Sequence, residues 1–369
     1  MNKIILARPI INISQSKKNL NKVLKSNFIN EGDQTREFEK KIGKYLDVKF
    51  VVTTTSGTTA LFLALKAAGI KNGDEVLIPN ITFPATANAV MMAGGKPTLI
   101  DVNPSNLLLD EKSLLRNINK KTKFILPVHV SGRGSNIKKI IKICKKKSIK
   151  VIEDAAEAFG SKINKKSLGT FGIAGCFSFA PNKIITTGQG GIVVTNSKSF
   201  FKKLKILKDQ GRIGPTTGGE DNYISAGYNF KFTNLQASLG LSQIKNLSWR
   251  IKKLKQMYIF YLKNIKENKN LRIIRFDLKG GEIPLWTDIY CKNRNKLFEY
   301  LKSNNILCRY YWKPLNSSLP YLSKFKNFKN SKKIQGKMMW LPSSLDMSFK
   351  QQKKVCDLIN KFYEKKNNG

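Results

Sequence analysis

Two short motifs in the 369-residue sequence could bind a ligand where strands end. Ser56-Gly57-Thr58 lies between an expected strand over residues 50–53 and an expected helix. Free amides at a helix N-terminus favour an anion such as phosphate, and glycine allows close approach. Asp154 follows an expected strand over residues 150–153, and parallel-sheet enzymes bind ligands at that end of their strands. Taken singly, the first motif is as typical of a plain helix start, and the second of an N-cap aspartate.

A lysine and an asparagine follow in the same direction along the chain. Lys183 comes after an expected strand over residues 175–179 and before the glycine-rich segment 186–191. Asn229 lies in Gly227-Tyr228-Asn229, ahead of a long helical pattern. In a chain this rich in lysine, a single lysine is more often a surface residue, and the asparagine motif alone is typical of a turn. The order and spacing of all four motifs favour one shared site.

The expected elements that position these motifs indicate an α/β protein. β-branched runs at residues 50–53, 75–78, 97–102, 123–130 and 150–153 alternate with helical patterns such as those at 57–68 and 82–93. Such alternation predicts a largely parallel sheet covered by helices on both faces. The segments 175–179 and 191–195 predict shorter strands that could pair antiparallel.

A helical pattern begins after Thr233 and continues past Trp249 to about Asn264. We place a domain boundary within it, near residue 246. The prediction is a large domain over residues 1–245, whose N-terminal segment could contact the second domain, and a smaller α+β domain over 246–369. Strands at 271–276 and 289–291 and helices at 294–303 and 350–365 are expected in the smaller domain.

The composition limits the classes of partner. Hydrophobic residues make up 41% of the chain, which is typical of a globular protein with a sizeable core. Lys+Arg outnumber Asp+Glu by 67 to 24, for a net charge of +43. Nucleic acid or an anionic membrane could attract such a charge, but the lysines are spread over nearly every segment, as A/T-rich codon usage would produce. The expectation is therefore no nucleic-acid and no membrane partner.

The sequence has few cysteine and histidine residues that could bind a metal ion. Five cysteines are isolated from one another, and His129 is the single histidine, so no metal site is expected. Scattered thiols suit a reducing compartment, and no signal peptide is evident, so we expect a cytoplasmic protein. His129 is expected to be structural or pocket-lining and not a base.

Seven ordered segments carry a resemblance to a known family. They are SGTTAL (56–61), GDEVLIP with TFPATANAV (73–90), DV (101–102), PVHVSG (127–132), EDAAEAFGS (153–161), GCFSFAPNKIITTGQGGIVVTN (175–196) and GYNFKFTNLQASLGLSQI (227–244). The sequence thereby resembles the DegT/DnrJ/EryC1/StrS family of pyridoxal-phosphate (PLP) aminotransferases, which act mainly on nucleotide-linked keto sugars. The resemblance covers essentially the whole chain and is weakest after residue 270. It implies PLP fold type I, as in aspartate aminotransferase, with a mixed, mostly parallel sheet in the large domain, a smaller α+β C-terminal domain, and a homodimer with shared active sites.

The resemblance also implies residue roles. Lys183 would form an imine with PLP and carry the proton between substrate carbon and cofactor, which passes through its pyridoxamine phosphate form; for this the lysine must be neutral during part of the cycle. Asp154 would pair with the pyridine nitrogen. The remaining implied cofactor contacts are Phe83 on the ring face, the Gly57 and Thr58 amides with the Ser178 hydroxyl on the phosphate, and Asn229 reaching the same phosphate from the neighbouring subunit.

Four further positions are weaker candidates. Glu157 stands where many members have glutamine facing the cofactor's ring hydroxyl, and glutamate there is typical of perosamine-synthase-like members. Lys231 replaces an arginine common after GYN, and so is a weaker candidate for bidentate anion binding. Arg309 and Tyr311 could border the sugar-nucleotide pocket, where an arginine would suit a diphosphate, although surface or core roles fit them equally.

The resulting prediction is amino transfer, with L-glutamate as donor, to the C4 keto group of a nucleotide-activated 6-deoxy sugar, for surface polysaccharide or O-antigen synthesis. One alternative is a sugar dehydratase of the same family, in which the lysine is typically replaced by histidine. Another is a 3-keto-sugar aminotransferase. A more remote one is a non-enzymatic nucleic-acid-binding regulator, which the net charge of +43 motivates.

Overall fold

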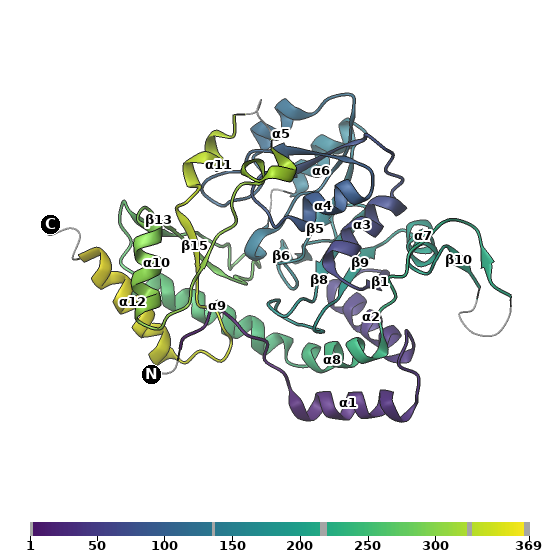
Figure 1. Cartoon of the computed structure of the whole chain (residues 1–369), viewed down its shortest axis with the longest axis horizontal. Coiled ribbons are helices and arrows are strands. Elements are labelled where there is room, and N and C mark those ends of the chain that lie inside the picture. The colour runs from purple at the N-terminus through teal and green to yellow at the C-terminus, as the bar shows by residue number, and fades with distance from the viewer. Residues whose placement is uncertain (1–2, 135–136, 215–219, 323–326, 365–369) are drawn as a thin grey trace.

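A computed structural model describes residues 3–134, 137–214, 220–322 and 327–364. Its largest sheet within that range has the strand order β1-β9-β8-β5-β4-β2-β3. Figure 1 labels β1, β9, β8 and β5 of this sheet. The strands are β1 (Phe50–Thr54), β2 (Glu75–Pro79), β3 (Lys96–Ile100), β4 (Thr122–Ile125), β5 (Lys150–Asp154), β8 (Ala174–Ser178) and β9 (Gly191–Thr195). β3, β2, β4, β5 and β8 pair in parallel, whereas β9 runs antiparallel to both β8 and β1. The predicted mixed, mostly parallel sheet is confirmed, and of the two later strands only β9 is antiparallel to both of its neighbours.

Helices around this sheet follow the apolar pattern of the sequence. α3 (Gly57–Ala67) is buried nearly all round because it packs between the sheet, α4 (Ala85–Met92) and α7 (Lys198–Lys208). α6 (Ile137–Lys146) buries only the stripe Ile137, Ile140 and Cys144, and its lysines are exposed. Such a stripe is the signature of a surface helix.

Several expected elements are shorter than predicted: the strands expected over 97–102 and 271–276 end at Ile100 and Ile273. Two further changes shape the site. The helix expected from residue 82 begins at Ala85, because Pro84 takes the N-cap position, so residues 81–84 form a loop that carries Phe83. The strand expected over 123–130 ends at Ile125, and the chain then turns through η1 (Val130–Gly132), where Ser131 adopts a φ of 55°. A positive φ is uncommon for serine and needs support from surrounding contacts.

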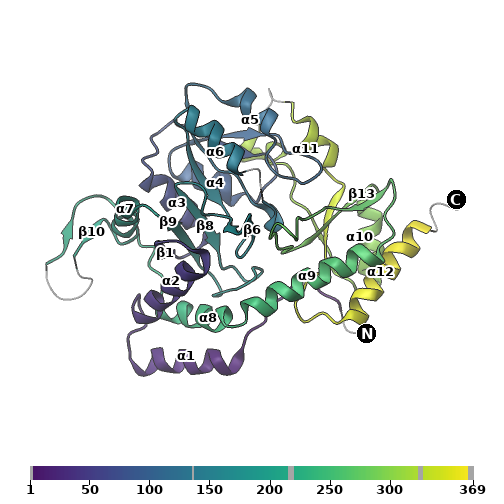
Figure 2. The same ribbon diagram turned by 180° about the vertical axis from the view of Figure 1, so that it is seen from behind.

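The C-terminal part holds a second, antiparallel sheet. Its strands, in order, are β12 (Leu271–Ile273), β13 (Thr287–Cys291), β15 (Met338–Leu341) and β14 (Arg309–Tyr310). The long helical pattern divides into α8 (Asn234–Ile244) and α9 (Leu247–Asn264), with the break at Lys245-Asn246. α9 packs against α12 (Phe349–Glu364), and α10 (Arg294–Ser303) lies beside them (Figure 2). The smaller α+β unit is confirmed, while the boundary at residue 246 stays a prediction.

The remaining elements are short or lie at the ends. They are α1 (Ile13–Lys25), α2 (Asp33–Leu46), α5 (Glu111–Asn117), β6 (Lys162–Ile163), β7 (Lys166–Ser167), β10 (Arg212–Ile213), β11 (Asn222–Tyr223), η2 (Leu315–Ser317), η3 (Leu319–Tyr321) and α11 (Lys329–Ile334). Among the helices of the described ranges, none is long and apolar enough to cross a membrane.

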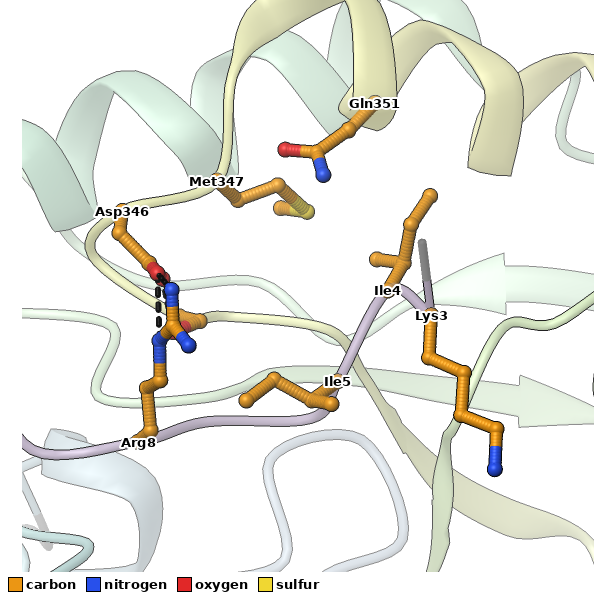
Figure 3. Close-up of a pocket in the computed structure, with 8 residues that line it drawn as sticks. Lys3, Ile4, Ile5, Arg8, Asp346, Met347 and Gln351 are labelled. Atoms are coloured by element: carbon orange, nitrogen blue, oxygen red, sulfur yellow. Dashed lines mark hydrogen bonds and ion pairs between the residues drawn. The ribbon is translucent and has the colours of Figure 1, made fainter. Parts of the chain in front are cut away.

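The N-terminal segment is held against the C-terminal part. Ile4 exchanges backbone hydrogen bonds with Asn305 and Leu307, and the Ser343 amide donates to the Leu6 carbonyl. The Arg8 guanidinium pairs with Asp346, and Figure 3 shows these two side chains pointing toward each other at the edge of a cavity.

A buried ion pair joins the loop after β4 to β13. The Arg133 and Asp288 side chains are 1% and 0% exposed, with Nη1 and Oδ2 2.5 Å apart. The Ser131 hydroxyl donates to Asp288 Oδ1 at 3.0 Å, and the guanidinium lies 4.5 Å from the centre of the Phe276 ring. The pair therefore connects the site-bearing edge of the large sheet to the second sheet.

We expect Arg133→Met to destabilise the protein by about 3–5 kcal/mol, because it leaves the Asp288 carboxylate buried without its cation. Denaturant unfolding measures the loss. The matched control is Arg36→Met, whose partner Asp33 is 88% exposed, and whose loss should stay below about 1 kcal/mol. Equal losses in the two variants would contradict the assigned importance of the buried pair.

Candidate active site

Asp154 is the last residue of β5 and is almost fully buried. The Thr86 hydroxyl donates to Oδ2 at 2.7 Å, and the Ala156 amide donates to Oδ1 at 3.2 Å. Thr86 lies in the first turn of α4 and is itself hydrogen-bonded to Thr82 at 3.0 Å. The N-terminal turn of α4 therefore fixes the carboxylate in one orientation.

The charge of Asp154 is only partly compensated. Burial raises the pKa of this carboxyl above its ordinary value, and the negative Glu157 raises it further. The pKa is lowered by the hydrogen bonds from Thr86 and Ala156 and by the positive charge of Lys183, but these effects are smaller than the effect of burial. Such a group favours a cationic N–H partner, since a positive charge in contact would stabilise the ionised form.

A small anion-binding cup is formed where α3 meets β8. The Ser56 hydroxyl accepts the Thr59 amide at 3.1 Å, and the Thr59 hydroxyl accepts the Ser56 amide at 2.9 Å, a capping box. The Gly57 and Thr58 amides, at the first helical positions, then have no intrahelical acceptor. A Cβ on Gly57 would lie 2.8 Å from the Ser178 Cβ, so only glycine lets the helix start and the Ser178 side chain approach this closely.

Lys183 lies in the loop after β8, and its Nζ donates to Glu157 Oε1 at 3.2 Å. The loop is fixed by backbone bonds from Lys183 to Ala180 and from Phe179 to Gly190, and by burial of Ile184 and Ile185. The lysine side chain is only 13% exposed. It is therefore an unusual lysine for this chain, because most of the others lie on the surface.

Phe83 lies in the loop before α4, three residues ahead of Thr86. Its ring is 51% exposed, with its centre 6.1 Å from that of Trp312. An aromatic ring this open, three residues before the threonine that contacts Asp154, can take a flat ligand on its free face.

Of the other predicted site residues, Asn229, Lys231 and Arg309 are not brought into this cluster within one chain, whereas Tyr311 lies near Glu157. Asn229 is exposed and forms a β-bridge with Asp209, and the Lys231 Nζ pairs with Asp209 Oδ1 at 3.0 Å. Arg309 is exposed and lies 5.5 Å from the centre of the Trp340 ring. Tyr311 is 4% exposed, with its ring packed against the same tryptophan.

His129 lies beside the site and has a structural setting. Its Nε2 is 2.9 Å from Glu153 Oε2, and both side chains are fully buried. Glu153 also accepts backbone amides from Gly169, Phe171 and Gly172. This carboxylate therefore anchors the loop before β8, and the structural role of His129 stays a prediction.

Thr86, Ser131 and Trp286 touch the central groups without having been predicted. Thr86 has a sequence signal, since it stands four residues after Thr82 and would share a face with it in the helix expected over residues 82–93. The Ser131 amide and the Trp286 indole both donate to Glu157, but neither has a local signal, because both contacts depend on tertiary folding.

Cavity volume alone does not locate this site. Cavities of about 30 and 10 Å³ touch Lys183, the second of them also lined by Glu157 and Ser178. A cavity of about 340 Å³ lies instead between the N-terminal segment and residues 344–351, as Figure 3 shows. The convergence of Asp154, Lys183 and the cup is the stronger indication.

Comparison with known proteins agrees with this geometry. The profile of the DegT/DnrJ/EryC1/StrS aminotransferase family matches residues 11–360. The chain belongs to this family. It is 32% identical to GDP-perosamine synthase of Escherichia coli O157:H7, covering 95% of this chain and 96% of that one. It is also 32% identical to the UDP-4-amino-4,6-dideoxy-N-acetyl-beta-L-altrosamine transaminase of Campylobacter jejuni serotype O:23/36, covering 95% of each.

The solved structure of Helicobacter pylori PseC, an aminotransferase of pseudoaminic acid biosynthesis, superposes with a TM-score of 0.92. It covers 99% of this chain and 100% of PseC at 26% identity. The DegT/DnrJ/EryC1/StrS enzyme described here is thus a sugar aminotransferase with the expected type I fold.

Aminotransferases of this family depend on PLP, and the residues present fit that cofactor. Asp154 offers a buried, undercompensated carboxylate to the ring nitrogen. The Gly57 and Thr58 amides with Ser178 offer donors to the phosphate, and Lys183 offers a shielded amine between them.

We expect Asp154→Asn to stabilise the apoenzyme at neutral pH while abolishing function. Because the folded-state pKa of Asp154 is raised, the folded chain holds a proton that the unfolded chain releases. The contribution of Asp154 to the free energy of unfolding therefore falls as pH rises from its pKa in the unfolded chain, about 3.9, through its higher pKa in the folded chain. Denaturant unfolding should give apo D154N a higher free energy of unfolding than wild type at pH 7, and this difference should shrink toward pH 4. An assay of the PLP-loaded enzyme should show activity lowered by about 100-fold or more.

The opposite-sign control is Asp209→Asn. Although burial opposes it, contacts with Arg212 and Lys231 lower the pKa of Asp209. This substitution should therefore destabilise the apoenzyme at pH 7. If D154N also destabilised the apoenzyme at pH 7, as D209N is expected to do, the claim that the charge of Asp154 is only partly compensated would be wrong.

Proposed function

We propose that this enzyme transfers the amino group of L-glutamate to the C4 keto group of a nucleotide-activated 6-deoxy sugar. The observation that supports the proposal most strongly is the shielded Lys183 amine beside Glu157, at the strand end that carries Asp154. Glutamate leaves as 2-oxoglutarate, and the sugar gains the amine. The C4 position is supported by the 4-amino sugar in the name of the Campylobacter relative.

The bound cofactor supplies an aldehyde that holds the amino group and a ring that accepts electrons from the substrate carbon. The protein supplies the proton transfers. In the proposed mechanism, Lys183 Nζ removes the proton from the substrate carbon in one half-reaction and returns one in the other. Burial of its side chain keeps bulk water from exchanging that proton.

The other residues orient the cofactor in this proposal. Asp154 keeps the ring nitrogen protonated, and Phe83 covers one ring face. The cup formed by Gly57, Thr58 and Ser178 binds the phosphate, and Asn229 of a second subunit completes it. The enzyme is accordingly proposed to act as a homodimer.

The acceptor is proposed to be GDP-4-keto-6-deoxymannose, in keeping with Glu157 in place of glutamine and with the GDP-perosamine synthase relative. Arg309, exposed beside Trp340, is proposed to bind the diphosphate, with Lys231 and Tyr311 as further proposed substrate contacts. The product would enter surface polysaccharide, such as O-antigen. The proposed compartment is the cytoplasm, where the free thiols would stay reduced.

Lys183 favours amine transfer over the dehydratase alternative, because dehydration in this family accompanies loss of that lysine. Purified protein should release 2-oxoglutarate from L-glutamate beyond one equivalent per active site only with a keto-sugar nucleotide, tested across GDP-, dTDP- and UDP-linked 4-keto and 3-keto sugars. Lys183→Ala should lower turnover by about 10²–10⁴-fold or more. The control Lys361→Ala, on the exposed face of α12, should match wild type.

Turnover that survives in K183A would overturn the role of the lysine. Failure of every sugar nucleotide in the wild-type enzyme would overturn the acceptor class.

A shared active site predicts complementation between two inactive variants. Lys183→Ala and Asn229→Ala should each be impaired alone, whereas mixed dimers regain one intact site. Random mixing makes about half of the dimers mixed, each with one of two sites intact, so about a quarter of wild-type activity should return. Absence of recovery would mean that Asn229 does not act across subunits.

A further inference from the structure

Glu157 is surrounded by hydrogen-bond donors from three parts of the chain. Its Oε2 accepts the Ser131 amide at 2.8 Å, and its Oε1 accepts Lys183 Nζ at 3.2 Å and Trp286 Nε1 at 3.3 Å. The side chain is 7% exposed, and Trp286 is 2% exposed. All three partners donate, so the carboxyl needs no proton of its own to satisfy them.

The C-terminal part determines this arrangement. Trp286 directly precedes β13, and the neighbouring Leu285 amide donates to the Ser131 carbonyl at 3.0 Å. Asp288 accepts the Ser131 hydroxyl at 3.0 Å. These contacts hold Ser131 in its positive-φ conformation, which aims its amide at Glu157. One short segment, residues 285–288, thus supplies one donor to Glu157 directly and orients a second.

We propose that Trp286 is a positioning residue that holds Glu157 as an ionised acceptor and thereby sets how strongly the Lys183 nitrogen retains a proton. The indole N–H disperses the negative charge on Oε1, the oxygen that also faces Lys183. With that donor present, the carboxylate attracts a protonated lysine nitrogen less strongly. The Ser131 amide keeps the carboxylate in place from the other oxygen.

Other titratable groups face Glu157 and take no part in the contact between Trp286 and Glu157. Asp154 approaches from β5, Asp288 from β13 and Tyr311 from the segment after β14. Arg133 is paired with Asp288 and largely neutralises it. Lys183 is the cation that contacts the Glu157 carboxylate directly in the described part of the chain.

The molecule offers a matched control for the indole N–H. Trp340 lies 5.6 Å from Trp286, ring centre to ring centre, and is equally buried. Its Nε1 has no hydrogen-bond partner among the described residues. Trp286→Phe and Trp340→Phe therefore remove the same atoms from two buried, neighbouring tryptophans, but only the first removes a donor from Glu157.

The test is a pH titration of the imine absorbance of the PLP-loaded enzyme without any sugar substrate. We expect W286F to raise the imine pKa by about 0.5–1 unit, a few-fold stronger retention of the proton, and W340F to leave it unchanged. In a Glu157→Gln background, which lacks the negative charge, W286F should have no effect. Melting temperatures of the apoenzymes report folding separately.

Glu157→Gln alone tests the same charge without altering the aromatic core, and should lower the imine pKa. An equal shift in W286F and W340F, a downward shift in W286F, or a shift that persists in the E157Q background would overturn the proposal. The titration needs PLP but no keto sugar, so its outcome is independent of the substrate proposed above.

Discussion

The site depends on one buried negative charge at the end of β5. Asp154 is enclosed by the sheet and by α4, and burial raises its pKa even though two hydrogen bonds favour the ionised form. Keeping a carboxylate there costs stability unless a cation is brought to it. A protonated pyridine nitrogen is such a cation. The stability of the apoenzyme and its affinity for PLP are therefore linked through a single side chain.

Asp154 and Glu157 are carboxylates three residues apart, and their different surroundings favour different roles. Asp154 accepts hydrogen bonds from a hydroxyl and one amide and is proposed to pair with the ring nitrogen. Glu157 receives an amide and an indole N–H and faces Lys183. The C-terminal sheet contributes to the second environment through Trp286 and Asp288. The C-terminal part of the chain consequently contributes contacts to the proposed site.

Local sequence patterns were sufficient to predict the central strands, the start of α3 at Gly57 and the order of the chemical motifs. The parallel sheet then brings Ser56, Asp154 and Lys183 to one edge, since parallel strands end on the same side. Thr86 was missed although its spacing from Thr82 carried a signal. Trp286 could not be found, because its contact with Glu157 joins residues 129 apart and has no periodicity. The roles proposed for Asn229 and Arg309 would depend on a second subunit and a substrate, which the contacts within one chain cannot predict.

The most direct measurement is the identity of the lysine that PLP modifies. Borohydride reduction of the yellow enzyme should attach a pyridoxyl phosphate group permanently, and mass spectrometry of its peptides should find that group on Lys183 and on no other lysine of this lysine-rich chain. Modification of a different lysine, or an enzyme that binds PLP without any reducible bond to the protein, would contradict the site described here.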